Sequence, residues 1–474
     1  MKDLSRPLLA TLAVLALMTA GLAMVIPADD SSATIISGSA GQNVTWSFDS
    51  SNQTITFSGT GAMYDYYYGQ EDHPLRDIGT SIRTVIINSG VTYIGSSIMN
   101  PGWGTMNVTS VTIPNTVTAI GESAFNSGKF TSITIPSSVE SIGTSAFGQC
   151  YDLKTVNLSE GLIFIDSQAF QRTGITSISL PASLLAIQPS AFYESEIENI
   201  SVSSSSVTYD SVDGVLFSKD HKTLVIYPAG RASIEYVVPA NTEIIGDWAF
   251  NSSTQLQSII LPNTINQIGE YAFHKCSSLA SINIPSSVSV IQKYTFAQTG
   301  FTSFSIPNNI TSIGPSAFSN CSSLTSVTVP PSVTSLVKDT FRFCSNLETA
   351  YVPNTTTVAS LAFPTTTNII RYDPEVSITS NQSDVSILTG SNFSYNVITD
   401  PEDATISVSG ASWLNVNGHL IYGTVSEPGE YTITVSAYKD GYGVGSQSFT
   451  VTVSSGLVFI SGPSAGYIVQ AGGQ

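Results

Sequence analysis

A motif of 22 or 23 residues recurs along the chain, and this repetition constrains the fold more than any other feature of the sequence. Each copy consists of a short alternating run, a proline, two apolar positions and an Ala-Phe pair, as in IPSSVESIGTSAF at 135–147 and IPNNITSIGPSAF at 306–318. One copy cannot bury its apolar side chains alone, so successive copies must stack. The repetition therefore predicts a mainly β solenoid.

Within a copy, the alternating run before the proline predicts a strand, and the proline ends its hydrogen-bond ladder. Stacked strands lie about 4.8 Å apart, so we expect ten or so coils to form one parallel sheet roughly 50 Å long. Longer copies close with Cys-x-x-Leu, as at 321–324, and shorter ones with a glycine corner, as at Thr173-Gly174 and Thr299-Gly300. We expect these corner glycines to have positive φ, which glycine adopts readily.

The consensus of the copies, IPxxVxxIGxxAFxxCxxLxxVxIP, resembles the BspA-like leucine-rich repeat of microbial surface proteins from about residue 82 to residue 363. The stretch GQNVTWSFDSSNQTITFSGTGAMYDY at 41–66 resembles the β cap that precedes such repeats. The resemblance implies a leucine-rich-repeat-type right-handed solenoid with an N-terminal β cap. It also implies a surface adhesin or a binder of host proteins and other microbes, which periodicity alone does not show.

Periodicity divides the chain into segments, with a β cap at 33–81 and the solenoid at 82–371. Within the solenoid, residues 203–238 form one long coil that is interpreted as an inserted hairpin, either a functional projection or a neutral decoration. After the period ends, short alternating strands at 375–455 predict an Ig-like β-sandwich with Trp413 in its core. Residues 456–474 are a tail or the start of a further module.

Residues 1–32 are predicted to direct export. Lys2 and Arg6 precede an apolar run, which is typical of a signal peptide, but the run of about 20 residues is also long enough to span a bilayer. A cleaved signal peptide and an uncleaved signal anchor therefore both fit. Either one places the rest of the chain in the extracellular space or on the cell surface, with membrane contact only through the anchor.

The net charge of −18, from 34 acidic and 16 basic residues, argues against one class of partner. Nucleic acid binding needs clustered Lys and Arg to neutralise phosphates, and no such cluster is present. The acidic surplus favours solubility instead. The expected partners are extracellular proteins or glycans.

The cysteines and histidines, which often act in catalysis or metal binding, are not arranged for either role. The four cysteines share one repeat position, three residues after the Phe: Cys150, Cys276, Cys321 and Cys344. We interpret them as small buried groups, although a disulfide is geometrically allowed between Cys321 and Cys344 on adjacent coils. The histidines are scattered: His73, His221, His274 and His419. No catalytic motif is recognisable, so we predict no enzyme activity, no metal site and no cofactor.

The main candidate binding surface lies on the concave face, where residues between the inward strand positions must point outward. They are Thr112, Thr134, Asn157, Ser179, Ser201, Ile260, Asn283, Ser305, Thr328 and Tyr351. Solenoids commonly bind through this face, but Ser and Thr also serve as soluble filler in strands. Ile260 and Tyr351 interrupt the polar column and are the expected contact anchors.

A second candidate surface is an aromatic patch in the cap formed by Tyr64, Tyr66, Tyr67 and Tyr68. Tyrosine rings can stack on glycans or proteins, and packing over the end of the solenoid is the alternative. The leading hypothesis is a cell-surface or secreted adhesin or protein-binding scaffold. A structural component of the cell envelope or biofilm and a glycan-binding surface protein are the alternatives.

Overall fold

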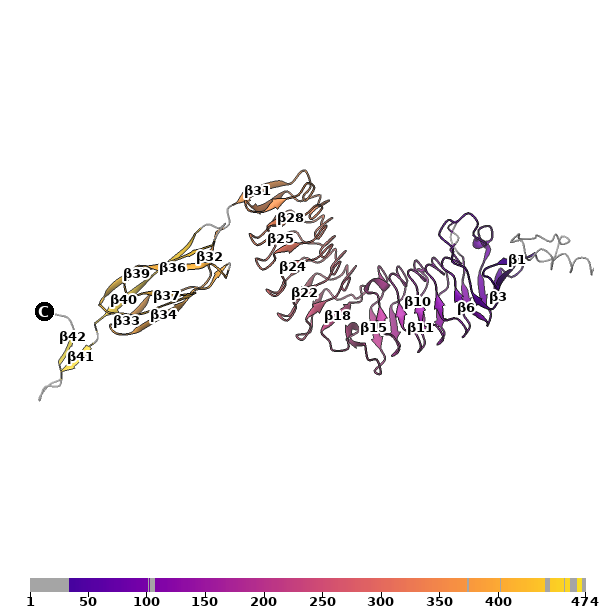
Figure 1. The fold of residues 1–474 in the computed structure, drawn as a ribbon, viewed down its shortest axis with the longest axis horizontal. Helices are drawn as coiled ribbons and strands as arrows, with labels where there is room; N and C mark the ends of the chain where they lie inside the picture. Colours follow the sequence, from indigo (N-terminus) through magenta and orange to yellow (C-terminus); the bar gives the residue numbers. More distant parts are fainter. Residues whose placement is uncertain are drawn as a thin grey trace, which may run out of the picture.

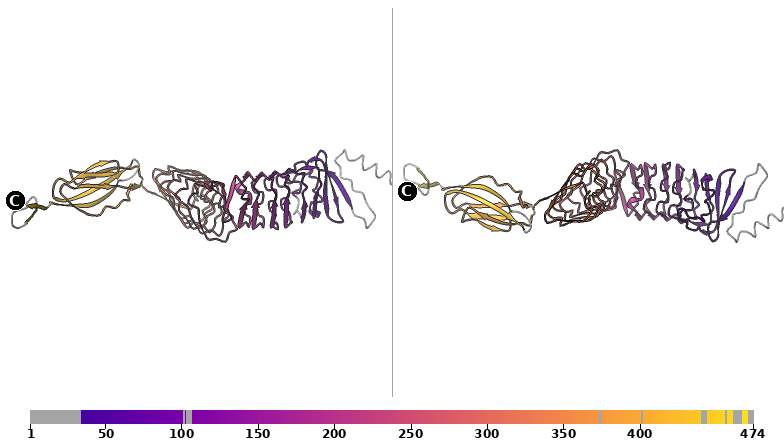
Figure 2. Two further views of the ribbon diagram at one scale, coloured as in Figure 1. Left: turned by 90° about the horizontal axis from the view of Figure 1, so that it is seen from below. Right: turned by 90° about the horizontal axis from the view of Figure 1, so that it is seen from above.

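The computed structural model describes residues 34–100, 102, 107–372, 375–400, 402–439, 444–455, 457–460 and 467–470. The chain is mainly β, as predicted, with a solenoid of about 12 turns. The cap, the solenoid and a β-sandwich follow one another along the long axis (Figures 1 and 2). The predicted export segment, 1–32, lies outside the described residues, and no helix within those residues has the length and apolarity needed to span a membrane.

The cap and the first coils share one sheet, in which the order is β1-β2-β3-β5-β7. The first three strands are antiparallel, and the last three are parallel. Their bounds are β1 (Ile35–Ser39), β2 (Val44–Asp49), β3 (Thr54–Gly59), β5 (Thr84–Ile87) and β7 (Ser110–Thr112). The cap therefore covers the first coil and continues directly into the solenoid.

Each later coil contributes one longer and one shorter strand. The longer strands of the first half are β9 (Ser132–Ile135), β11 (Thr155–Leu158), β13 (Ser177–Leu180) and β15 (Asn199–Val202). The shorter ones form a parallel sheet of β4 (Gly61–Ala62), β6 (Val91–Ile94), β8 (Ala119–Ile120), β10 (Ser141–Ile142), β12 (Phe164–Ile165) and β14 (Ala186–Ile187). Short 3-10 segments, η1 (Gly79–Ser81) and η2 (Pro189–Phe192), occupy two of the corners.

The second half repeats this plan. Its longer strands are β19 (Glu235–Val237), β21 (Ser258–Ile260), β23 (Ser281–Ile282), β25 (Ser303–Ser305), β27 (Ser326–Thr328), β29 (Thr349–Pro353) and β31 (Asn368–Tyr372). Its shorter strands are β20 (Ile244–Ile245), β22 (Gln267–Ile268), β24 (Val290–Ile291), β26 (Ser312–Ile313), β28 (Ser335–Leu336) and β30 (Thr357–Val358). Between the halves lie β16 (Tyr209–Val212), β17 (Val215–Ser218) and β18 (Thr223–Ile226).

The prediction of one continuous parallel sheet is wrong. The longer strands form separate ladders, including β13-β15 before residues 203–238 and β19-β21-β23 after them. The antiparallel ladder of β16, β17 and β18 separates β15 from β19, and β18 then pairs in parallel with β20. The solenoid consequently has two hydrophobic cores, and it bends where they meet (Figure 1).

The C-terminal unit is a β-sandwich of two main sheets, ordered β33-β40-β39-β36 and β34-β38-β37, beside a β32-β35 pair. Trp413 is buried in its core with Phe393 and Phe449. The bounds are β32 (Ser377–Ile378), β33 (Val385–Leu388), β34 (Asn392–Asn396), β35 (Thr399–Asp400), β36 (Thr405–Ser409), β37 (Asn415–Asn417), β38 (Leu420–Thr424), β39 (Gly429–Tyr438) and β40 (Gly445–Ser454). A hairpin of β41 (Leu457–Ile460) and β42 (Tyr467–Gln470) follows.

Within each half, the Ala-Phe corner of a coil is bonded to the next coil through backbone N–H groups. Ser145 and Gln149, which flank Ala146-Phe147, both have positive φ, at 53° and 59°. This conformation costs non-glycine residues roughly 1 kcal/mol each. It turns alternate N–H groups toward the next coil, giving bonds of 3.0 Å from Ser145 to Ser167, 2.9 Å from Phe147 to Ala169 and 2.8 Å from Gln149 to Gln171. Three bonds per corner offset the strain and set the spacing of the coils.

The phenylalanines of these corners stack along the solenoid. In the first half the column contains Phe125, Phe147, Phe170 and Phe192, with ring centroids 5.5–5.7 Å apart. In the second half Tyr227 begins the column, 4.9 Å from Phe250, and the Tyr227 N–H donates to Ala249 O. The column continues through Phe273, Phe296, Phe318, Phe341 and Phe363. The inserted segment thus supplies Tyr227 as the first ring of the stacked column in the second half.

The corner glycines do not have the predicted backbone conformation. Neither Gly174 nor Gly300 has positive φ. A Cβ at Gly174 would lie 2.8 Å from Tyr151 O, and one at Gly300 would lie 2.4 Å from Ser277 O. Glycine is therefore required because the preceding coil approaches closely, while the left-handed residues are those that flank the Ala-Phe pair.

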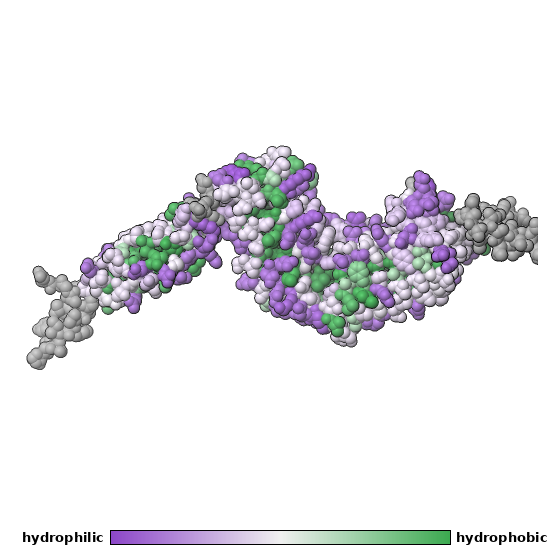
Figure 3. All heavy atoms as spheres, viewed as in Figure 1, coloured by the Kyte–Doolittle hydropathy of each residue, from purple (hydrophilic) through white to green (hydrophobic). Residues whose placement is uncertain are grey.

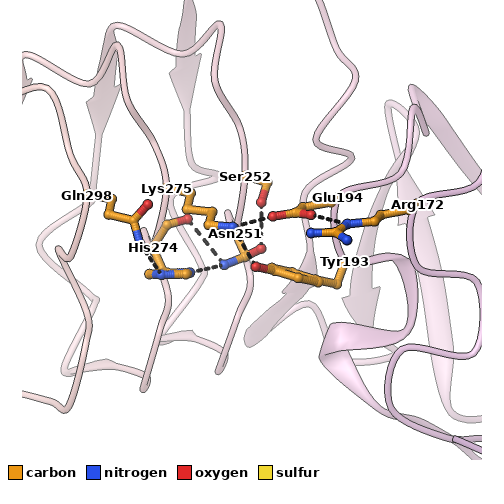
Figure 4. Close-up of polar contacts among 8 residues, drawn as sticks. All are labelled: Arg172, Tyr193, Glu194, Asn251, Ser252, His274, Lys275 and Gln298. Atoms are coloured by element: carbon orange, nitrogen blue, oxygen red, sulfur yellow. Dashed lines mark hydrogen bonds and ion pairs between the residues drawn. The ribbon is translucent and has the colours of Figure 1, made fainter. Parts of the chain in front are cut away.

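A cluster of side chains, here called the brace, joins the two halves (Figure 4). Glu194 of the first half accepts a hydrogen bond from Arg172 at 2.5 Å. It also forms an ion pair with Lys275 of the second half. Lys275 Nζ also donates to Tyr193 Oη at 2.7 Å. The ring of Tyr193 packs edge-on against Trp248, with centroids 5.7 Å apart. These contacts link residues about 80 positions apart across the interrupted sheets.

The pKa values of Glu194 and His274 in the brace are shifted by their surroundings. Burial favours a raised pKa for Glu194, but hydrogen bonds from Lys275 and Arg172 outweigh it and lower that pKa to about 2. Burial and the adjacent Lys275 charge lower the pKa of His274 to about 4. The neutral His274 ring accepts a 2.8 Å hydrogen bond at Nδ1 from Asn251 Nδ2. At neutral pH the brace therefore contains an ionised Glu194 beside an uncharged imidazole.

Replacing Phe273 by Ala should lower the free energy of unfolding by about 3–5 kcal/mol, because the change removes a fully buried ring from the middle of the column. Urea denaturation measures the loss. The matched control is Phe343→Ala, because that ring is 60% exposed and its removal should cost less than about 1 kcal/mol. Equal losses in the two variants would contradict the assigned role of the column.

Replacing Lys275 by Met should lower the free energy of unfolding at pH 7 by roughly 1 kcal/mol, a value kept small because water reaches the pair. Since the pKa of Glu194 is depressed to about 2 in the folded chain, the stabilisation is complete above the unfolded pKa and is lost as the pH falls toward 2. Urea denaturation at several pH values should show the difference between wild type and variant shrinking in acid. The control Lys222→Met breaks the exposed pair with Glu243 and should have almost no effect.

Candidate functional site

The outward side chains of the longer strands form a surface on each half of the solenoid, and the two surfaces together are here called the strand face. Nine of the ten predicted residues are exposed on it, and only Thr328 is half-buried. Backbone pairing places several of them side by side, including Thr134 with Asn157, Ser179 with Ser201, and Thr328 with Tyr351. The structure therefore brings the predicted residues together within each half, while the inserted segment separates the two groups.

One predicted residue has a structural role. Asn283 Nδ2 donates to Leu261 O at 2.8 Å, and Asn283 Oδ1 accepts from Leu261 N at 2.9 Å. The side chain thus continues the backbone ladder where β23 ends. Both polar atoms of its side-chain amide are already hydrogen-bonded to Leu261, so Asn283 is a weaker candidate for ligand contact than its neighbours.

The first half of the strand face contains a shallow hollow of about 490 Å³ over β7 and β9. Its twelve lining residues include Ser110, Thr112, Ser132 and Thr134, and none of them is charged. Hydroxyl groups that point to solvent can donate and accept hydrogen bonds equally. This hollow is suited to a neutral polar group.

The second half of the strand face is more apolar. Ile260 is 56% exposed and lies beside Val237, which is 64% exposed. Tyr351 is 42% exposed and lies beside Ile370 at 39%. Apolar residues gather over this half in Figure 3. Val237 was missed from the sequence although it stands two residues before Pro239, as Ile260 stands before Pro262; Ile370 lacks that marker.

The cap tyrosines separate into two environments. Tyr64, Tyr67 and Tyr68 are 49%, 78% and 74% exposed. Tyr66 is half-buried, packs 4.8 Å from the ring of His73, and has a pKa raised to about 12 by burial. Only Tyr66 therefore packs inward, and the other three tyrosines point to solvent.

The cysteines occupy one repeated environment. All four are buried and free. Each thiol donates to the carbonyl oxygen of the preceding repeat phenylalanine, at 3.3 Å for Cys150 and 3.1 Å for Cys276, and burial raises the pKa of both to about 12. A thiol held protonated in this way is a poor nucleophile.

Outside the brace, the ion pairs of the described residues each join two side chains. His221 Nε2 lies 2.9 Å from Asp210 Oδ2 near the turn between β17 and β18. In the part of the chain that the structure describes, no group of three or more His, Cys, Asp or Glu side chains is arranged to hold a metal ion. The strand face and the exposed tyrosines are therefore the two surfaces to which a function can be assigned.

Comparison with solved structures supports the fold. The pneumococcal vaccine antigen PcpA is 19% identical over 74% of this chain and 94% of its own, with a TM-score of 0.54. A leucine-rich repeat protein from Eubacterium ventriosum is 23% identical over 74% and 87% of the two chains, with a TM-score of 0.54. A leucine rich cell surface protein from Faecalibacterium prausnitzii is 24% identical over 70% and 96%, with a TM-score of 0.51.

None of the curated protein sequences matches the chain. The family model for the BspA type leucine rich repeat region matches six copies, at residues 97–220 and 234–383. The gap between the two matched ranges falls within the long coil that carries β16, β17 and β18. The match covers more than half of the sequence, and the chain belongs to the BspA type leucine rich repeat family.

Proposed function

We propose that this chain is a cell-surface, adhesin-type scaffold that binds a protein partner through the strand face. Membership of the BspA type family supports a scaffold built for interaction rather than for chemistry. One structural relative is described as a cell surface protein and another as a vaccine antigen, which supports an extracellular location. The partner is accordingly an extracellular protein.

The exposed apolar pairs of the second half carry the proposal. Most large apolar side chains of the coils are buried, yet Val237 with Ile260 and Tyr351 with Ile370 form two exposed pairs on the strand face. The polar outward positions of three coils lie between the pairs. Exposed apolar groups that gather on one face are typical of protein contact sites. Rigid backbone ladders hold them, so little conformational entropy is lost on binding.

The hollow over β7 and β9 supports glycan binding as a second candidate function. Its lining offers uncharged hydroxyl and amide groups, which match the hydroxyls of a sugar. No exposed aromatic ring lines the hollow, so stacking on a sugar ring is not provided there. The protein partner therefore ranks first.

The sandwich that follows β31 is proposed to space the solenoid from its attachment or to extend the array. Its Ig-like classification remains a prediction. The predicted export segment, as a cleaved signal or as an anchor, is consistent with this arrangement but lies outside the described residues.

The double variant Ile260→Ser, Tyr351→Ala should weaken binding to a protein partner at least about 10-fold, because it removes two exposed anchors of the strand face. The partner is identified by screening the purified full chain against arrays of extracellular proteins and glycans, and affinity is then measured by surface plasmon resonance. The control variant is Val207→Ser, since Val207 is 75% exposed and lies on the connection between β15 and β16 rather than on a longer strand.

Each other outcome identifies an alternative. Saturable binding to a glycan that is lost in Thr134→Lys, but retained in the double variant, would replace the protein partner by the glycan. If neither array shows saturable binding, the chain is a structural component of the envelope or biofilm, and the adhesin proposal is rejected. Unchanged urea midpoints in all variants establish that folding is not affected.

A further inference from the structure

The segment between β4 and β5, here called the tyrosine loop (residues 63–83), projects from the first coils above β6 (Figure 1). Tyr64, Tyr67 and Tyr68 lie on it with exposed fractions of 49%, 78% and 74%. It leaves the solenoid at the Ala-Phe corner side, and none of its residues lines the strand-face hollow. The loop is therefore a surface separate from the strand face.

Side-chain anchors hold the base of the loop. Asp65 accepts hydrogen bonds from Tyr93 Oη at 2.8 Å and from Ser96 N at 2.7 Å. Tyr66 N donates to Ser96 O at 2.9 Å. These bonds connect the tyrosine-bearing turn to the next coil, so Tyr64 and Tyr67 project from a fixed backbone.

A buried histidine fixes the other side of the loop. His73 is 4% exposed, its Nε2 donates to Ser97 O at 3.1 Å, and its Nδ1 accepts from Leu75 N at 3.1 Å. Burial lowers the pKa of His73, which agrees with a neutral ring that uses both nitrogens. Leu75 is fully buried beneath it. The loop thus has a small core of its own.

The tip is closed by Gln70. Tyr67 N donates to Gln70 Oε1 at 3.0 Å, and Gln70 Nε2 donates to Asp72 Oδ1 at 2.7 Å. Tyrosine provides a large contact area with few rotatable bonds, which is why binding loops use it often. Because hydrogen bonds hold the backbone of the loop, its three exposed tyrosines would lose little conformational freedom when a partner binds.

The charges of the loop indicate the partner's chemistry. Exposed carboxylates at Glu71, Asp72 and Asp77 accompany the tyrosines. The two guanidinium groups of the loop both donate to backbone carbonyls within it, Arg76 to Glu71 O at 3.0 Å and Arg83 to Thr80 O at 3.1 Å. Tyrosine faces and carboxylates both attract cations. The protein itself uses this pairing, since Lys275 Nζ lies 5.1 Å from the centroid of the Tyr193 ring.

We infer that the tyrosine loop is a second binding surface, which recognises a segment of a protein partner that carries exposed lysine or arginine side chains. The tyrosine rings supply the contact area, and the neighbouring carboxylates select a positive charge. The inference does not depend on the strand face binding anything, and the two surfaces are tested with different variants.

The test uses the full chain and a fluorescent peptide of about eight residues that alternates Lys and Arg with Gly, with its affinity followed by anisotropy. Tyr67→Ala, Tyr68→Ala should raise the Kd at least about 10-fold. Tyr67→Phe, Tyr68→Phe should stay within about 2-fold, because the ring faces remain. Matched peptides with Glu or Ser in place of the basic residues should bind at least about 10-fold more weakly.

The control for diffuse attraction to a chain of net charge −18 is Tyr151→Ala, since Tyr151 is 55% exposed and lies outside the tyrosine loop, between β10 and β11. Equal affinity of wild type, Tyr67→Ala, Tyr68→Ala and Tyr151→Ala for the basic peptide overturns the inference, as does equal binding of the Ser peptide. The strand-face variant Ile260→Ser, Tyr351→Ala should bind the basic peptide as wild type does. Unchanged urea midpoints show that the exposed substitutions leave the fold intact.

Discussion

The stacking of one Ala-Phe corner on the next is the interaction on which the solenoid depends. Each corner is strained, because residues such as Ser145 and Gln149 have positive φ without being glycine. The strain is tolerated because that backbone directs N–H groups to the following coil, where they bond to carbonyl oxygens at 2.7–3.3 Å. Phenylalanine rings fill the space behind the corner at a spacing of about 5 Å, close to the strand spacing of the sheets. Hydrogen bonds and ring contacts therefore require the same distance between coils, and each reinforces the other.

A solenoid of this kind is weakest where that repetition is interrupted. At residues 203–238 the sheets end and restart, and the ring of Tyr227 takes the place of a repeat phenylalanine in the stacked column. The packing there is imperfect, since a cavity of about 20 Å³ lies between Phe192 and Tyr227, and the buried Tyr227 hydroxyl has no partner. Charged and aromatic side chains then join the halves from the outside. The brace therefore joins the two halves at the point where the regular stacking of the coils is interrupted.

The sequence was most informative where every coil obeys the same rule. The period was sufficient to predict the strands, the burial of the Ala-Phe pairs and the common environment of Cys150 and Cys276. It was misleading at Gly174 and Gly300, because their small size is needed for contact with a neighbouring coil rather than for backbone conformation. It gave no sign of the bond between Lys275 and Tyr193, which depends on how two coils 82 residues apart are oriented. Contacts within the repeat can thus be deduced from one copy, whereas contacts at its interruption require the fold.

Binding surfaces on such a scaffold are subject to a different constraint from its core. Interior positions must fit the same packing in every coil and admit only small changes, such as Cys150 to Thr173, so larger variation falls at outward positions and insertions. Outward positions in the first half retain hydroxyl side chains, whereas those in the second half become apolar at Val237, Ile260 and Tyr351. The two regions lie on either side of the bend, and the brace links the two halves that hold them. The same few contacts that stabilise the interruption therefore also hold together the two halves on which these outward positions lie.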